Sequence, residues 1–464
     1  MRTLLVANRG EIACRILRSA RCLGVSTVAV YSDADANALH VAMADRAIAI
    51  GPAPAAQSYL DPDRLLAAAA QSGADAIHPG YGFLSENGDF AEAVQAAGLI
   101  WVGPAPATIR AMGDKETARQ TAARAGLPIV PGSARLAIDP PEAEIDAAAQ
   151  TTGFPLLIKA VAGGGGIGMR RADGPDGLAK AVAAVQAAAA RTFGDGTVYL
   201  ERYLPRARHI EVQVIGLGDG RAYHLHERDC SLQRRFQKVI EEAGAPGLPE
   251  AVRRQLCDAA TALAEDVRYL GAGTVEFIVD AETNAFYFLE MNTRVQVEHP
   301  VSEMITGADI VAEQLRLAGA AGPAVQTGAP AVGHAIECRL YAENPAKRFY
   351  PSPGTLTRFD LPTAGPDLRI DTGYRAGDTV TPFYDPLLAK IITRGPTRAA
   401  AIDAALRALA HVQVEGIVTN RAFLIACLSH PEFAAGRVHT RFIDENLPDL
   451  QAAAARTTPE TPAV

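Results

Sequence analysis

One segment, FYFLEMNTRVQVEHP (286–300), restricts the structures open to this chain more than any other. It begins as an apolar strand and then alternates polar with apolar residues, and side chains two apart lie on the same face of an extended strand. One face is therefore predicted to carry the polar residues Glu290, Asn292, Arg294, Gln296 and Glu298. Because charged groups are costly in an apolar strand unless a ligand or partner uses them, the segment indicates a binding site.

A second carboxylate, Glu276, lies in the apolar run TVEFIVD (274–280), which we interpret as the antiparallel neighbour of this strand. Two facing strands that each present a carboxylate can hold a hard divalent cation between them. Mg²⁺ takes one or two carboxylates and fills its remaining positions with nucleotide phosphates and water. The pair Glu276 and Glu290 therefore predicts nucleotide–metal chemistry, with Arg294 and Glu298 beside it.

The length of 464 residues exceeds one compact core and indicates roughly two to four packed units. The net charge of −8 argues against general binding of nucleic acid or of anionic membranes. Six cysteines without metal-ligand spacing indicate reduced thiols, and no apolar run is long enough to span a membrane. Arg2 is followed at once by a short strand rather than by a signal peptide. We expect a cytoplasmic protein that binds neither nucleic acid nor membranes.

The order of strands and helices divides the chain. Strands and helices alternate over residues 1–112, which predicts a parallel sheet with helices on both faces. Residues 113–330 follow, with a small α/β lobe at about 131–203 and strands that we interpret as antiparallel after it. A further unit is expected at 331–447, and the last residues, 448–464, lack a periodic apolar pattern and are expected to form a loose tail.

The glycine-rich run AGGGGIGM (162–169) follows an apolar strand that contains Lys159. Consecutive glycines let the backbone approach phosphates closely, so with Lys159 the run favours a nucleotide lid over a simple mobile loop. A dinucleotide site is rejected, because no acidic residue closes a neighbouring strand at the required spacing. The nearby strand YLERYL, which contains Glu201, suits an adenine hinge, although a purely structural role is equally open.

Several charged segments are also candidates. In HERDCSLQRRFQKVIEE (226–242) charges of both signs interleave with apolar residues, which favours an anionic substrate or a fixed ion-pair network over a solvated surface. Arg339 in AIECRLYAE lies among apolar neighbours and indicates an anionic ligand slightly more than a salt bridge. The loops ANRGEIA (7–13) and HPGYGFLSEN (78–87), and YDPLLAK with Asp385 and Lys390, are explained at least as well by structural roles.

Taken in order, these motifs resemble the biotin carboxylase family, the ATP-grasp component of the biotin-dependent carboxylases. The resemblance runs from about Arg2 to about Leu447 and rests on ANRGEIA, HPGYGFLSEN, MGDKE, IKAVAGGGGIGM, RHIEVQV, ERDCSLQRR, EMNTRVQVEHP, ECRLYAEN and FYDPLLAK. It implies an α/β and α+β protein with a Rossmann-like parallel-sheet N-terminal domain, an ATP-grasp domain with a mobile lid and an α+β C-terminal domain. The implied reaction is ATP-driven carboxylation of biotin by bicarbonate, with Mg²⁺ or Mn²⁺.

The resemblance also assigns residues by role. For ATP it implies Lys115, Lys159, Gly163, Gly164, Gly165 and Gly166 at the phosphates, Glu201 and Leu204 at the adenine, and His209 and Gln233 near the ribose. For the metal it implies Glu276, Glu290 and Asn292. For bicarbonate it implies Lys238, Arg294, Gln296, Val297 and the general base Glu298, and for the biotin ureido oxygen Arg339.

The sequence departs from the family pattern at four positions. Ile167 replaces a basic residue, Phe236 a histidine, Arg202 a lysine and Gly244 a proline. The first two changes are expected to weaken contacts to ATP by about 1 kcal/mol each, the size of one hydrogen bond. The metal, bicarbonate and biotin positions all keep the family residues.

The resemblance indicates a stand-alone biotin carboxylase subunit, most simply that of acetyl-CoA carboxylase in fatty acid synthesis. No biotinyl-lysine motif is present, so we expect a separate biotin carboxyl carrier protein, carboxyltransferase subunits and a homodimer. Alternatives are the corresponding subunit for propionyl-CoA, methylcrotonyl-CoA or urea, a carboxylate–amine ligase, and a non-catalytic ATP-binding paralogue. The complete set of Glu276, Glu290, Glu298 and Arg339 argues against the last.

Overall fold

The computed structural model describes residues 1–161, 169–319 and 330–457. Its first domain contains a five-stranded sheet in the order β3-β2-β1-β4-β5, in which every pairing is parallel, as the alternating pattern predicts. The helix ends follow local signals: α3 begins at Pro62 behind the cap Asp61 and ends before Gly73, whose φ is +64°. The strands are β1 Thr3–Val6, β2 Ser26–Ser32, β3 Arg46–Gly51, β4 Ala76–His78 and β5 Ile100–Trp101. The helices are α1 Gly10–Cys22, α2 Leu39–Met43, α3 Pro62–Ser72, α4 Gly88–Ala96 and α5 Pro106–Gly113.

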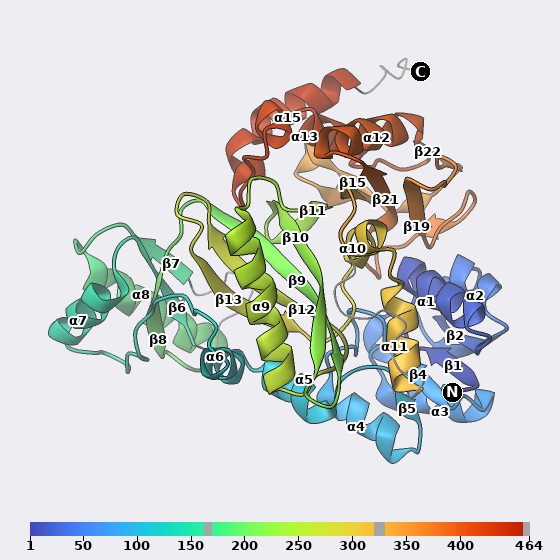
Figure 1. Cartoon of the computed structure of the whole chain (residues 1–464), viewed down its shortest axis with the longest axis horizontal. Coiled ribbons are helices and arrows are strands. Elements are labelled where there is room, and N and C mark those ends of the chain that lie inside the picture. Colours follow the sequence, from blue (N-terminus) through green and yellow to red (C-terminus); the bar gives the residue numbers. More distant parts are fainter. Residues whose placement is uncertain (162–168, 320–329, 458–464) are drawn as a thin grey trace.

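The lid region is a small layer of helices on a three-stranded antiparallel sheet, ordered β7-β6-β8. In Figure 1 it projects to the side of the central sheet, joined to the first domain through α6. Its own apolar cluster, which includes Leu156, Ile158 and Leu200, holds the layer together. The elements of the lid are α7 Glu142–Thr152, β6 Leu156–Ala160, β7 Met169–Ala172, α8 Leu178–Phe193 and β8 Val198–Arg202, and α6 Lys115–Arg124, which precedes them, packs against β13 (Phe286–Asn292) of the central sheet. The predicted glycine positions 163–166 and the departure Ile167 lie outside the described residues.

The centre of the molecule is an eight-stranded antiparallel sheet in the order β13-β12-β9-β10-β11-β14-β21-β19. The predicted antiparallel pairing of the strands after residue 204 is therefore confirmed. Helix α9 covers one face of β9 and β10 (Figure 1). The strands are β9 Ala207–Leu217, β10 Ala222–Arg234, β11 Gln237–Ala243, β12 Leu270–Asp280 and β13 Phe286–Asn292. The helices are α9 Glu250–Asp266, α10 His299–Thr306 and α11 Ile310–Ala318.

The C-terminal part continues this same sheet instead of forming a separate one, because β14 pairs with β11 and places Ile240 opposite Cys338. Its longer elements are β14 His334–Tyr341, β19 Leu368–Thr372, β21 Leu387–Gly395, α12 Arg398–His411, α13 Arg421–Leu428 and α15 Phe442–Thr457. Its short elements are β15 Glu343–Asn344, β16 Tyr350–Pro351, β17 Gly354–Thr355, β18 Arg358–Asp360, β20 Thr379–Val380, β22 Gln413–Glu415 and α14 Pro431–Ala434.

Two expectations from the sequence are wrong. Residues 448–457 are the second half of helix α15 rather than a loose tail, because Leu450 and Ala454, one turn apart, are buried against the C-terminal core and alanine favours the helix. The extended strand predicted through Glu298 ends at Asn292. The chain then turns, and α10 begins at His299 because Pro300 has the φ of a first helical turn.

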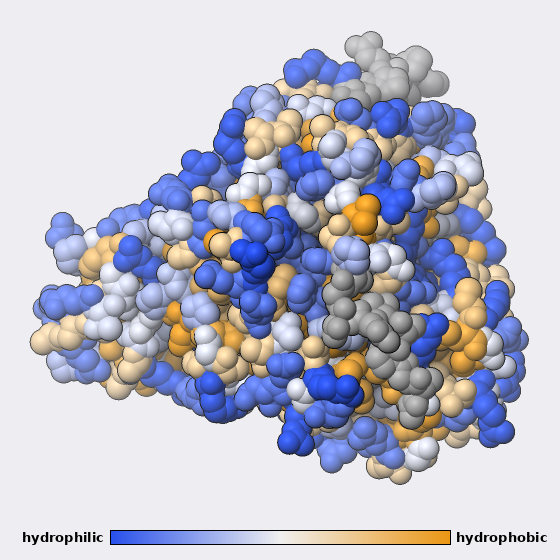
Figure 2. Space-filling model, viewed as in Figure 1, coloured by the Kyte–Doolittle hydropathy of each residue, from blue (hydrophilic) through white to orange (hydrophobic). Residues whose placement is uncertain are grey.

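The face of the molecule shown in Figure 2 is mainly hydrophilic, with apolar side chains scattered over it. Among the described residues, no helix combines the length and apolar character that crossing a bilayer requires.

Candidate active site

A cavity of about 1680 Å³ lies where the first domain, the lid and the central sheet meet. Most of the predicted site residues line it: Lys115, Lys159, His209, Gln233, Lys238, Glu276, Glu290, Asn292, Arg294, Gln296, Val297, Glu298 and Arg339. Glu201 is not among the lining residues, and its carboxylate is bound by Arg119 at 2.8 Å and by Lys159 at 2.7 Å. Leu204 does not line the cavity either, so the adenine positions stay predictions.

The two predicted metal ligands face each other across neighbouring strands. Glu276 of β12 is the register partner of Glu290 of β13, so the predicted antiparallel pair of carboxylates is confirmed. Glu276 is held in place from several sides: Asn292 Nδ2 and Gln296 Nε2 donate to its Oε1 at 2.8 and 2.9 Å, and His209 Nε2 lies 2.9 Å from its Oε2. Glu276 is thus oriented by neutral amides and an imidazole before any ligand binds.

The two carboxylates differ in their electrostatic surroundings. Burial raises the pKa of Glu276, but Lys238 and His209 outweigh burial and hold that pKa far below its usual value. Burial and the charge of Glu276 together raise the pKa of Glu290. Among the described residues, no cationic side chain is within ion-pair distance of Glu290. This pair, with one unneutralised carboxylate open to the cavity, fits a divalent cation such as Mg²⁺.

Lys238 of β11 neutralises three carboxylates at the floor of the cavity. Its Nζ lies 2.6 Å from Glu211 Oε2, 3.2 Å from Glu276 Oε1 and 2.5 Å from Glu298 Oε1. Desolvation lowers the pKa of Lys238, but these carboxylates raise it well above its usual value, so the ammonium is permanently charged. Lys238 therefore couples the metal pair to Glu298.

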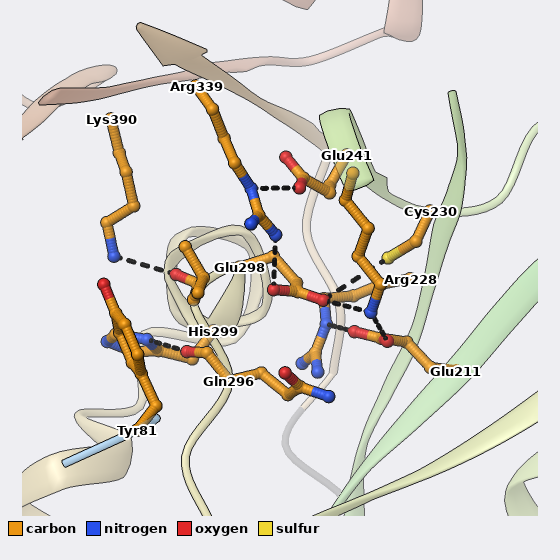
Figure 3. A network of polar contacts seen from close by, with 12 residues as sticks. Tyr81, Glu211, Arg228, Cys230, Glu241, Gln296, Glu298, His299, Arg339 and Lys390 are labelled. Atoms are coloured by element: carbon orange, nitrogen blue, oxygen red, sulfur yellow. Dashed lines mark hydrogen bonds and ion pairs between the residues drawn. The ribbon is translucent and has the colours of Figure 1, made fainter. Parts of the chain in front are cut away.

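Glu298 accepts from a second cation as well. Arg339 of β14 donates through Nη2 to Glu298 Oε2 at 2.8 Å, and its Nε lies 2.5 Å from Glu241 Oε1. Figure 3 shows the guanidinium of Arg339 between Glu241 and Glu298. Burial raises the pKa of Glu298, but Lys238, Arg339 and Arg228 hold it well below the usual range. Glu298 is therefore ionised, the state in which a carboxylate accepts a proton.

Arg294 completes the wall of the cavity in the turn after β13. Its Nη1 and Nη2 donate to Gln296 Oε1 at 2.9 Å and Asn292 Oδ1 at 3.0 Å. Its Nε donates to Glu86 of the first domain at 2.8 Å. Although the predicted strand ends early, these contacts bring its polar residues to one cavity.

Sequence reasoning missed Glu86 and Glu211. Glu211 anchors Lys238 and also accepts from Arg228 Nε at 2.6 Å, and the side chains of Arg228 and Glu211 are both fully buried. The alternation in RHIEVQV was the available signal, because His209, Glu211 and Gln213 are two apart on β9 and share a face. Glu86 lies in the HPGYGFLSEN loop, for which a structural role was at least as good an interpretation from the sequence, and its contact with Arg294 depends on packing between two domains.

Three of the four departures from the family pattern, Phe236, Gly244 and Arg202, lie among the described residues. Phe236 lies in the tight turn between β10 and β11, with φ +66°, and its side chain is 77% exposed while lining the cavity. Gly244 has φ +87°, a conformation that the ring of proline excludes. Arg202 ends β8.

The comparisons with known proteins cover nearly the whole chain. Residues 1–109 match the family Biotin carboxylase, N-terminal domain, residues 114–323 match Carbamoyl-phosphate synthase L chain, ATP binding domain, and residues 337–445 match Biotin carboxylase C-terminal domain. Biotin carboxylase 1 of Bacillus subtilis is 47% identical over 96% of this chain and 98% of its own length. The methylcrotonoyl-CoA carboxylase subunit alpha of Glycine max is 50% identical over 96% of this chain, and the chain spans 61% of its length.

Solved structures agree. The biotin carboxylase of Campylobacter jejuni, in complex with β-γ-ATP, has a TM-score of 0.86 and 41% identity, over 96% of this chain and 98% of that one. The biotin carboxylase domain dimer of Hydrogenobacter thermophilus 2-oxoglutarate carboxylase, in complex with MgADP, ADP and bicarbonate, has a TM-score of 0.87 and 40% identity, over 97% of this chain and 98% of that one. With matches in sequence and structure over nearly its full length, the chain belongs to the biotin carboxylase family of ATP-dependent ligases.

Proposed function

We propose that this protein carboxylates biotin on a carrier protein, using ATP and bicarbonate. The observation that carries the proposal is the position of Glu298, an ionised buried carboxylate held by Lys238 at 2.5 Å and Arg339 at 2.8 Å beside the metal pair. Such an arrangement suits a reaction in which one small anion is deprotonated, phosphorylated and passed to a second acceptor. The relatives with bound ATP analogue, MgADP and bicarbonate support the same substrates.

In the first step, bicarbonate attacks the γ-phosphate of ATP and forms carboxyphosphate and ADP. Lys238 and Arg294 hold the anion in line for attack, with Gln296 and Val297 beside it, and Glu298 takes the proton of bicarbonate. The low pKa of Glu298 makes it a weak base while Lys238 and Arg339 are bound to it. Binding of bicarbonate draws Lys238 toward the new anion, which raises the pKa of Glu298 and strengthens it as a base.

Glu276 and Glu290 would hold a divalent cation, which would neutralise charge at the transferring phosphoryl group. Lys115 of α6 and Lys159 of the lid would bind the remaining phosphate charge, and His209 and Gln233, which also line the cavity, would contact the ribose. Asn292 orients Glu276 through its 2.8 Å hydrogen bond.

In the second step, carboxyphosphate decomposes to CO₂ and phosphate, and the phosphate removes the N–H proton of biotin. Arg339 stabilises the negative charge that then develops on the ureido oxygen, and the biotin nitrogen attacks CO₂. The placement of Arg339 next to Glu298 supports this order, because both steps then occur in one cavity.

The next question is which acyl-CoA accepts the carboxyl group from carboxybiotin. We propose the role expected from the sequence, as the biotin carboxylase component of acetyl-CoA carboxylase, working with a separate carrier and carboxyltransferase subunits as a homodimer in the cytoplasm. The names of the relatives favour a second candidate, a methylcrotonoyl-CoA or propionyl-CoA carboxylase. Reconstitution with carrier and carboxyltransferase proteins, offering each acyl-CoA in turn, distinguishes these candidates by which thioester incorporates labelled bicarbonate.

The activity itself is tested by ADP release from the purified protein with Mg²⁺, with and without bicarbonate and free biotin. We expect ADP release that needs bicarbonate and is stimulated by biotin. Glu298→Gln should lower this rate by about a hundredfold or more while ATP still binds, since general base and substrate positioning are lost together. Glu282→Gln, the same change at an exposed turn, is the control. A rate of ADP release in the unaltered protein that biotin does not raise would refute the proposal.

A further inference from the structure

Three motifs that the proposed reaction does not use meet at one point at the wall of the active-site cavity, which Glu11 and Tyr81 line. They are the ANRGEIA loop with Glu11 on α1, the HPGYGFLSEN loop with Tyr81, and YDPLLAK with Lys390 on β21. The Tyr81 hydroxyl donates to Glu11 Oε1, and Lys390 Nζ lies 3.0 Å from the same oxygen. Figure 3 shows Lys390, Tyr81 and His299 together on one side of Glu298.

Lys390 is fully buried, and its ammonium binds the backbone of the turn that carries the base. Its Nζ donates to the carbonyl oxygen of Val297 at 2.8 Å. Asp371, its register partner on β19, lies 3.9 Å away and is already paired with Arg369 at 2.6 Å. A buried lysine is costly unless its charge and donors are used, and here they are used by Glu11 and by one carbonyl.

The preceding carbonyl of the same turn is held too. The Nδ1 of His299 lies 2.7 Å from the carbonyl oxygen of Gln296. Burial, together with Lys390, Arg15 and Arg369, holds the pKa of His299 well below its usual value, so the ring is neutral and donates this hydrogen bond through Nδ1. Both peptide units before Glu298 therefore have fixed partners.

These contacts matter because Glu298 is neither in a strand nor inside a helix. It is the N-cap residue of α10, with φ −82° and ψ 8°. This backbone conformation is sparsely populated, so contacts from other residues are needed to hold it. The plane of the Val297–Glu298 peptide sets the direction of the Glu298 side chain, and a shift of about 1 Å in a reacting group can lower a rate about a hundredfold.

We propose that Lys390 is a positioning residue that fixes the Gln296–Glu298 turn by tying the Val297 carbonyl to Glu11 of the first domain. Lys390 does not line the cavity, so it acts through the backbone rather than by touching substrate. The proposal rests on the proposed function for its kinetic consequence, but the order of the turn itself is measurable without turnover.

The decisive variant is Lys390→Met combined with Glu11→Gln. Lys390→Met alone leaves the buried Glu11 carboxylate without its cation and can unfold the protein. The double change removes both charges, and the amide that replaces the Glu11 carboxylate still accepts from Tyr81, so the fold is preserved while the donor to Val297 is lost. Lys347→Met, at an exposed position of the same domain, is the matched control.

Two readouts test the double variant. In hydrogen–deuterium exchange, amides of residues 295–299 should exchange at least about tenfold faster than in the unaltered protein, with the first-domain sheet unchanged. In kinetics, we expect kcat to fall about tenfold to a hundredfold and the KM for bicarbonate to rise, with the KM for ATP unchanged.

Unchanged exchange in the turn would overturn the proposal. So would full recovery of bicarbonate kinetics in the double variant, because charge balance alone would then explain Lys390. An unaltered protein without biotin-stimulated turnover refutes the proposed function instead, and exchange still decides the positioning role.

Discussion

Replacing Lys238 with methionine removes the cation that three carboxylates share. In the structure Lys238 lies 2.5 to 3.2 Å from Glu211, Glu276 and Glu298. Breaking a buried ion pair by removing one partner costs about 3–5 kcal/mol, and we expect the lower end because 12% of this side chain is exposed. Glu211 keeps Arg228 and Glu298 keeps Arg339, so the variant should fold.

The catalytic effect is larger than the structural one. Loss of one preorganised charge at a developing anion costs about 10² to 10³ in kcat. The pH dependence changes as well. In the unaltered protein the pKa of Glu298 lies well below its usual value, so Glu298 imposes no loss of activity in the neutral range. Without Lys238, the largest lowering influence, this pKa rises, and kcat/KM for bicarbonate should fall more steeply than in the unaltered protein as the pH is lowered toward about 5.

The assay is bicarbonate-dependent ADP release from about pH 5 to 9, with the stability of each variant measured by thermal unfolding. Lys347→Met controls for loss of a lysine at an exposed site. Lys238→Arg should keep the same acid limb of the pH profile as the unaltered protein, because it keeps the charge. Turnover of Lys238→Met within about threefold of the unaltered protein, with an unchanged pH profile, would refute both the binding role of Lys238 and its electrostatic hold on Glu298.

Two further predictions concern carboxylates. Glu290→Gln should raise the Mg²⁺ concentration for half-maximal activity at least about tenfold, yet slightly raise the melting temperature of the metal-free protein, because the raised pKa of Glu290 shows that its charge is disfavoured in the fold; a lower melting temperature would contradict this. Burial, with Glu298, raises the pKa of Glu241 to about 7, so its contribution to stability is full below about pH 4.5 and is lost as the pH rises through 7. Glu241→Gln should therefore flatten the fall in melting temperature between about pH 5 and 8, and an unchanged slope would speak against it.

Much of this protein follows from local patterns in its sequence. Alternating strands and helices predict the parallel sheet of the first domain, because apolar periodicity distinguishes a buried strand from an amphipathic helix. Two apolar strands that each carry one carboxylate predict the facing pair Glu276 and Glu290. Local reasoning failed where long-range packing decided the structure: helix α15 is ordered through burial of Leu450, and the strand after Asn292 gives way to a turn before Pro300.

Only the tertiary structure decided how the site is assembled. The pairing of β11 with β14 joins two sections into one sheet and brings Arg339 within 2.5 Å of Glu241 and 2.8 Å of Glu298. The contacts of Glu86 with Arg294, and of Glu11 with Lys390, join residues more than two hundred positions apart. Sequence reveals residue type and local period, which fix which groups a site can contain. The distances between those groups depend on which elements pack together, and these distances set the charge of Glu298.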